Sequence, residues 1–132
     1  MKASSEPRKK FRQVEFFKKD DGTKPVGDWL RAVRAIDKDR AQSIAIGIRY
    51  FEEYPGAVVP TKIFEKVTDN IWEIKVHHGK EQFRLLSFPD GNSVIIAVHG
   101  LAKKTRALVD QDLRLAERRR TEYLARRKRK PG

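Results

Sequence analysis

The sequence contains no cysteine, which excludes disulfide bonds, thiolate chemistry and cysteine-ligated zinc. Its longest uninterrupted apolar run, residues 94–98, is far shorter than the roughly 20 residues of a transmembrane helix. The charged N-terminus lacks the apolar stretch of a secretory signal peptide. We therefore expect a cytoplasmic protein that does not bind membranes. Its 132 residues suit one domain with a hydrophobic core.

Several common catalytic arrangements are also missing. The chain has no carboxylate pair with metal-binding spacing, no Ser/His/Asp arrangement and no glycine-rich phosphate loop. We therefore expect neither a metal ion nor another cofactor.

Positive charge, in contrast, is abundant, with 30 lysines and arginines against 18 acidic residues and a formal net charge of +12. Residues 1–12 and 118–132 hold 13 basic and two acidic residues, so the rest of the chain is nearly neutral. Arginine-rich ends attract polyanions such as RNA through counterion release. The alternative is that these ends only keep the protein soluble. A membrane surface would also require an apolar face, which the C-terminal run lacks.

The hydrophobic pattern predicts an α+β protein. Pro25 suits the first turn of one helix, and Asp37 can cap a second helix. Gly47 inside the second helix costs about 1 kcal/mol relative to alanine, which a close helix contact would explain. Strands are predicted at residues 11–18, 61–67, 71–78, 82–88 and 93–101, with a last helix over residues 105–126. This order predicts an antiparallel sheet of four to five strands, with the N-terminal helix pair packed on one face and a C-terminal helix.

The same pattern suggests the domain organisation. Residues 1–10 lack periodicity and are expected to be a disordered basic arm. Residues 11–126 form the single expected domain, and residues 127–132 a basic tail.

Candidate site residues lie on three successive predicted strands. In the run I-W-E-I-K-V-H at residues 71–77, Lys75 and His77 alternate with apolar residues, which should face the helices. Arg84 lies inside an apolar strand, where a charge needs a partner. That partner could be a substrate, or Glu73 or Glu81 across the hairpin.

The last strand ends in His99, followed by a glycine and the pair Lys103-Lys104. Together these strands would supply cations for a phosphate and bases that can move a proton. A metal-free attack by an RNA 2′-hydroxyl on its own phosphate needs a base, a cation at the phosphate and an acid at the leaving oxygen. A lone histidine, taken by itself, is more often structural than catalytic.

Residues 71–123 resemble the RelE/ParE toxin superfamily, and within it the phage-derived HigB-like branch. The resemblance rests on I-W-E-I-K at 71–75, F-R-L-L at 83–86, V-H-G-L-A-K-K-T at 98–105 and the charged helix A-E-R-R-R-T-E-Y-L at 116–124. The helix starting P-V-x-D-W-L at residues 25–30 is similar to the opening helix of that family. The resemblance implies a RelE-like fold and a type II toxin that cleaves mRNA, typically on the ribosome. It also implies a cognate antitoxin with a helix-turn-helix DNA-binding domain.

The resemblance also implies roles for individual residues. Arg84 would contact the scissile phosphate with Lys103 or Lys104, while His99 and Lys75 would handle protons. Some members use a tyrosine or carboxylate near the C-terminal helix, where Tyr123 is the only tyrosine. The residues expected to bind RNA are His77, Arg106, Arg118, Arg119 and Arg120. His77 could equally be a solvent-facing strand residue.

Two alternatives to an endoribonuclease remain. One is a binding toxin of the same fold that cleaves nothing, as in the gyrase-directed ParE-like members. The other is a basic RNA-binding or regulatory protein without toxicity.

Overall fold

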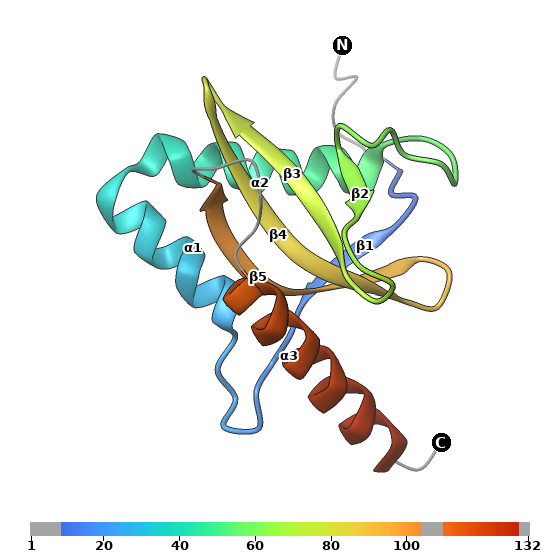
Figure 1. The fold of residues 1–132 in the computed structure, drawn as a ribbon. Coiled ribbons are helices and arrows are strands. Elements are labelled where there is room, and N and C mark those ends of the chain that lie inside the picture. The colour runs from blue at the N-terminus through green and yellow to red at the C-terminus, as the bar shows by residue number, and fades with distance from the viewer. Residues whose placement is uncertain (1–8, 104–109, 130–132) are drawn as a thin grey trace.

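The computed structural model describes residues 9–103 and 110–129. Within them the chain forms one mixed sheet with helices on both faces (Figure 1). The elements are β1 (Gln13–Phe16), α1 (Pro25–Ile36), α2 (Lys38–Glu53), β2 (Phe64–Lys66), β3 (Trp72–His78), β4 (Glu81–Asp90), β5 (Val94–Lys103) and α3 (Asp110–Arg129). The α+β class is confirmed, and the arrangement is compatible with a RelE-like fold. None of the described helices combines the length and the apolar character needed to cross a membrane.

Local sequence signals position the two N-terminal helices as predicted. Pro25 begins α1. The Asp37 carboxylate accepts hydrogen bonds from the backbone N–H groups of Asp39 and Arg40, at 2.9 and 3.3 Å, and so caps α2. Gly91 has a φ of 79° in the turn after Asp90, a conformation that favours glycine.

The strand order is β1-β5-β4-β3-β2. Strands β2 to β5 form the predicted antiparallel meander. Strand β1, however, pairs with β5 in parallel, so the expectation of an entirely antiparallel sheet is wrong at this edge. The reason is that β1 joins no hairpin. The helix pair carries the chain from β1 to the opposite edge of the sheet, and such a long crossover permits parallel pairing.

The two faces of the sheet have separate apolar cores. Helices α1 and α2 cover one face, where Ile74 and Val76 are buried as predicted. Helix α3 crosses the other face over Leu86, Phe88 and Val98 (Figure 1). The candidate site residues must therefore be assigned to one face or the other.

Helix α2 lies directly against β3 at Gly47. A Cβ atom at this position would be 2.7 Å from Cγ1 of Val76, which is closer than two carbon atoms normally approach. The close contact expected from the sequence is therefore confirmed.

We expect Gly47→Ala to destabilise the protein even though alanine favours the helix. Helix propensity would gain about 1 kcal/mol, whereas overpacking typically costs about 1–3 kcal/mol. Urea denaturation should therefore give a lower free energy of unfolding. Gly27→Ala is the matched control, because a Cβ atom there would be 3.6 Å from its nearest neighbour, Cβ of Lys24. A Gly47→Ala variant more stable than the wild type would show that α2 can move away from the sheet.

Candidate active site

A β-bulge in β5 decides which face His99 occupies. Ser87 of β4 pairs with Ala97, but the preceding residue Leu86 pairs with His99, so Val98 has no partner in β4. In a regular strand without the bulge, Ala97 and His99 would both lie on the face covered by α1 and α2. The bulge turns His99 to the face of Leu86 and α3, in line with the ability of bulges to redirect a side chain.

Because of the bulge, His99 lies on the same face as Arg84. Arg84 is two residues before Leu86 in β4, and Lys75 of β3 lies directly opposite Arg84. Strand β5 continues on the same register to Lys103, which pairs with Gln82. Three of the predicted catalytic residues, Lys75, Arg84 and His99, therefore share one face of three adjacent strands.

Arg84 is almost completely buried, with 4% of its surface exposed. Its Nη1 lies 2.7 Å from Oε1 of Glu73, and its Nη2 donates a 2.5 Å hydrogen bond to Oε1 of Gln82. Of the two partners considered from the sequence, Glu73 is the one found, whereas Glu81 pairs with Arg40 at 2.7 Å. Nε of Arg84 is buried and finds no acceptor within residues 9–103 and 110–129. One strong donor of the guanidinium thus meets no acceptor in the described part of the chain.

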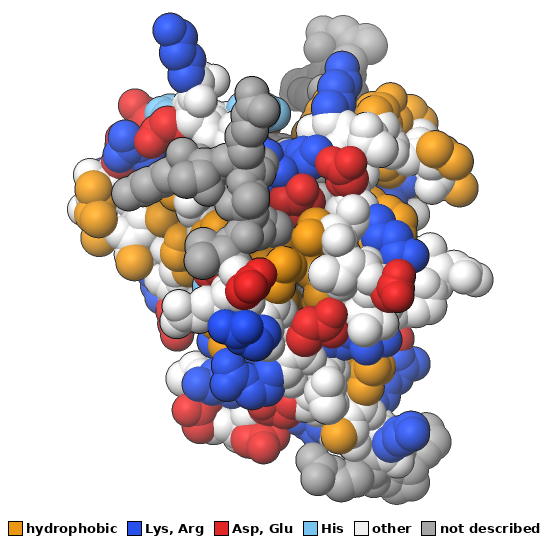
Figure 2. Space-filling view, viewed as in Figure 1, with side chains coloured by type: hydrophobic (Ala, Val, Ile, Leu, Met, Phe, Trp, Pro, Cys, Tyr) orange, Lys and Arg blue, Asp and Glu red, His pale blue; other side chains and the backbone are white. Residues whose placement is uncertain are grey.

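Lys75 is also paired with a carboxylate. Its Nζ lies 2.5 Å from Oε1 of Glu65 in β2. Glu65 and Glu73 are themselves cross-strand neighbours, so two acids lie beside two bases on β2, β3 and β4, and each acid pairs diagonally with one base. The pairing offsets the repulsion that Lys75 and Arg84 would otherwise exert as directly opposed like charges. Acidic and basic side chains are accordingly interspersed in the view from the α3 side, rather than gathered in one basic patch (Figure 2).

His99 is held by the first turn of α3. Its Nε2 lies 2.8 Å from Oδ1 of Asp112, and both side chains remain about one-fifth exposed. A carboxylate in this position fixes the orientation of the imidazole ring. Asp112 was not among the residues predicted from the sequence, because acidic residues in a first helical turn are expected for helix stability alone.

The arginines expected to bind RNA differ in their surroundings. Arg118 is exposed on α3. Arg119 Nη1 donates a 2.7 Å hydrogen bond to the carbonyl oxygen of Val98, the bulged residue, and burial lowers the pKa of its guanidinium. The Arg120 guanidinium carbon lies 5.7 Å from the centroid of the Phe88 ring. Arg119 therefore contacts the strand that carries His99.

The remaining predicted site residues lie at the ends of the strands or outside the described residues. His77 is exposed near the end of β3, on the same face as Arg84 and opposite Gln82. Lys103 is the last residue of β5. Lys104 and Arg106 lie outside the described residues.

Tyr123 is not part of this cluster. Its hydroxyl donates a 2.6 Å hydrogen bond to Oδ2 of Asp90, and burial raises its pKa. Asp90 is at the far end of β4, about 20 Å along the strand from Arg84. Arg127 also pairs with Asp90. These contacts anchor the C-terminal half of α3 to the turn between β4 and β5.

Some arginines of the basic ends likewise maintain the fold. Arg12 Nη1 donates to the carbonyl oxygens of Phe51 and Tyr54 at 2.6 and 2.9 Å, so it caps the C-terminus of α2. Arg126 donates to the carbonyl oxygen of Lys18 at 2.6 Å. Helix α3 continues to Arg129, past residue 126. The charge of the two ends is therefore not all available to RNA.

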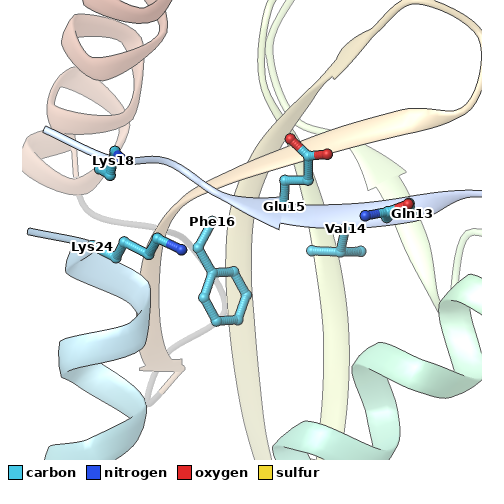
Figure 3. A pocket seen from close by; sticks show the side chains of 6 residues that line it. All are labelled: Gln13, Val14, Glu15, Phe16, Lys18 and Lys24. Atoms are coloured by element: carbon cyan, nitrogen blue, oxygen red, sulfur yellow. The ribbon is translucent and has the colours of Figure 1, made fainter. Parts of the chain in front are cut away.

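A hollow of about 530 Å³ lies along β1, away from these residues. It is lined by Gln13, Val14, Glu15, Phe16, Lys18 and Lys24 (Figure 3). It contains no histidine and none of the predicted site residues. No group of three or more metal-binding side chains is found in the described parts of the chain either. The cluster of Lys75, Arg84 and His99 is therefore the strongest candidate site.

Comparison with protein families gave one match over most of the chain. Residues 28–121 match the family described as "Phage derived protein Gp49-like (DUF891)". The matched region contains Lys75, Arg84, His99, Asp112 and Arg119. The search of curated proteins found no match.

Proposed function

The chain belongs to the phage-derived Gp49-like family, a RelE/HigB-type toxin family, and from this we propose that it is a toxin that cleaves mRNA on the ribosome without a metal ion. The observation that carries the proposal is the convergence of Arg84, Lys75 and His99 on one face through the bulge at Val98. A cognate antitoxin is the expected partner of such a toxin.

The geometry supports distinct roles in an attack by the 2′-hydroxyl. A base removes the 2′-hydroxyl proton, the 2′-oxygen bonds to phosphorus, and the 5′-oxygen leaves and accepts a proton. The products are a 2′,3′-cyclic phosphate and a 5′-hydroxyl. We assign the two proton transfers to His99 and Lys75. Asp112, 2.8 Å from His99, orients the imidazole.

Arg84 is assigned to the phosphate. Its charge, and its Nε–H that meets no acceptor among the described residues, suit the extra negative charge of the five-coordinate phosphorus. Lys103 and Lys104 are proposed to assist, as expected from the sequence. Because Glu73 already pairs with Arg84, a phosphate must share or displace this carboxylate. The site therefore favours the more highly charged transition state over a substrate phosphate diester.

The chemistry of the RNA ends provides the first test. Purified protein incubated with translating ribosomes should produce mRNA fragments with 2′,3′-cyclic phosphate and 5′-hydroxyl ends. End-specific ligation and sequencing would detect them. Fragments with 3′-hydroxyl and 5′-phosphate ends would contradict attack by the 2′-hydroxyl.

Expression in growing cells, combined with the same analysis of RNA ends, separates the alternative functions. Growth arrest with no new RNA ends would favour a binding toxin such as a gyrase-directed one. Expression that causes neither growth arrest nor cleavage would favour a non-toxic RNA-binding protein. Cleavage of naked RNA at the same rate would show that the protein does not need the ribosome. The proposed attack by the 2′-hydroxyl would still hold.

A further inference from the structure

Strand β3 has an exposed edge beyond the end of β2. The register between the two strands ends at Ile74, and the backbone N–H of Lys75 makes one further bond to the carbonyl oxygen of Ile63, at 2.8 Å. On its other side, β3 remains paired with β4 as far as His78. No described strand lies beside His77 on the β2 side. Such an edge can template pairing with another chain.

A hollow of about 460 Å³ runs between this edge and α2. We call it the β3-edge groove. Its lining residues are Ser43, Ile46, Gly47, Tyr50, Lys62, Ile63, Lys75, Val76 and His77. Ile46 and Tyr50 are 54% and 56% exposed, although both are large and apolar. The groove thus joins an open strand edge to an uncovered apolar wall.

The two sides of the groove differ in chemistry. Val76 faces α2, where it meets Gly47, whereas Lys75 and His77 alternate with it and face the other side of the sheet. A strand added to this edge would therefore place every second side chain near Ile46, Tyr50 and Ile63. Its other side chains would lie near Lys75 and His77, where acidic groups are complementary.

We propose that the β3-edge groove binds an extended segment of the antitoxin in which apolar and acidic residues alternate, and that this segment adds to the sheet as a strand beside β3. Main-chain hydrogen bonds supply affinity in this binding mode, and the pockets for alternate side chains supply specificity. RNA fits the groove less well, because it offers no apolar side chains for Ile46 and Tyr50.

The proposed docking also explains how the antitoxin would inhibit RNA cleavage. A carboxylate entering beside Lys75 would join Glu65 in neutralising Nζ and hinder the approach of RNA. This consequence rests on the proposed function, whereas the docking itself requires no catalysis.

A blocked octapeptide of alternating leucine and glutamate is the probe, and the full chain is the receptor. Hydrogen exchange followed by NMR should show slower exchange of the His77 amide on peptide binding, with β1 unchanged. The same peptide with lysine in place of glutamate should not bind. Unchanged exchange at His77, or equal protection by oligouridine, would overturn the proposal.

Ile46→Glu provides a second, independent measurement. Because Ile46 is exposed on α2, the substitution should not disturb the core, but it places an acid against the bound segment. We expect at least about a tenfold loss of peptide affinity. Ile36→Glu is the matched control, because Ile36 is 84% exposed and lies outside the groove. Equal affinity of Ile46→Glu and wild type would contradict docking here, whether or not the protein cleaves RNA.

Discussion

Replacing Arg84 with alanine is expected to abolish RNA cleavage and also to destabilise the fold by about 3–5 kcal/mol. The two effects have different causes. Cleavage is lost because the phosphate loses its buried cation, a change that typically costs about 10²–10³-fold in rate. Stability is lost because Glu73, whose Oε1 lies 2.7 Å from Arg84, would remain buried without its counter-charge.

The double variant Arg84→Ala/Glu73→Ala separates these effects. Removing both members of a buried ion pair costs much less than removing one, so most of the stability should return in urea denaturation. Cleavage on ribosomes should stay at the background level. If the folded double variant cleaved mRNA at the wild-type rate, the assignment of Arg84 to the phosphate would be wrong.

Arg40→Ala is the matched control for this experiment. Arg40 pairs with Glu81 at 2.7 Å, but that ion pair is exposed to solvent. Exposed ion pairs contribute little to stability. Arg40→Ala should therefore leave both the free energy of unfolding and cleavage nearly unchanged.

The sequence predicted most of the fold because its signals are local. Pro25, Asp37 and the Asp90-Gly91 turn mark boundaries that depend only on neighbouring residues, and the structure confirms them. The parallel pairing of β1 with β5 is different. This pairing joins segments about 80 residues apart, so no local sequence pattern predicts it.

The site was less predictable for a related physical reason. Residues 94–98 are all apolar, so the run has no alternation from which the face of His99 could be determined. The bulge at Val98 sets that face. The contact of His99 with Asp112 depends in turn on where α3 crosses the sheet. The residue types and their adjacent strands could be predicted from the sequence, but the face that His99 occupies and its contact with Asp112 could not.

Substitution of Arg119, which contacts the bulge in β5, should have the second large effect. From the sequence it was expected to bind RNA. In the structure its Nη1 donates to the carbonyl oxygen of Val98, the residue that has no partner in β4. We therefore predict that Arg119 acts as a positioning residue, which stabilises the bulge next to His99.

We expect Arg119→Met to reduce cleavage by about 10²-fold, because small displacements of catalytic groups have effects of this size. Methionine retains apolar contacts but leaves the Val98 carbonyl without this donor, which should cost about 1–3 kcal/mol in stability. Urea denaturation measures the second effect. The His99 imidazole NMR signals should shift in the same variant.

Steady-state kinetics distinguishes this positioning role from RNA binding. A positioning residue affects kcat more than KM, whereas loss of a phosphate contact raises KM and makes binding less sensitive to salt. Arg114→Ala is the matched control, since Arg114 is an exposed arginine on the same helix, and it should leave the His99 signals unchanged. If Arg119→Met raised KM alone and left those signals in place, Arg119 would contact RNA directly. The bulge would then position His99 without the hydrogen bond from Arg119.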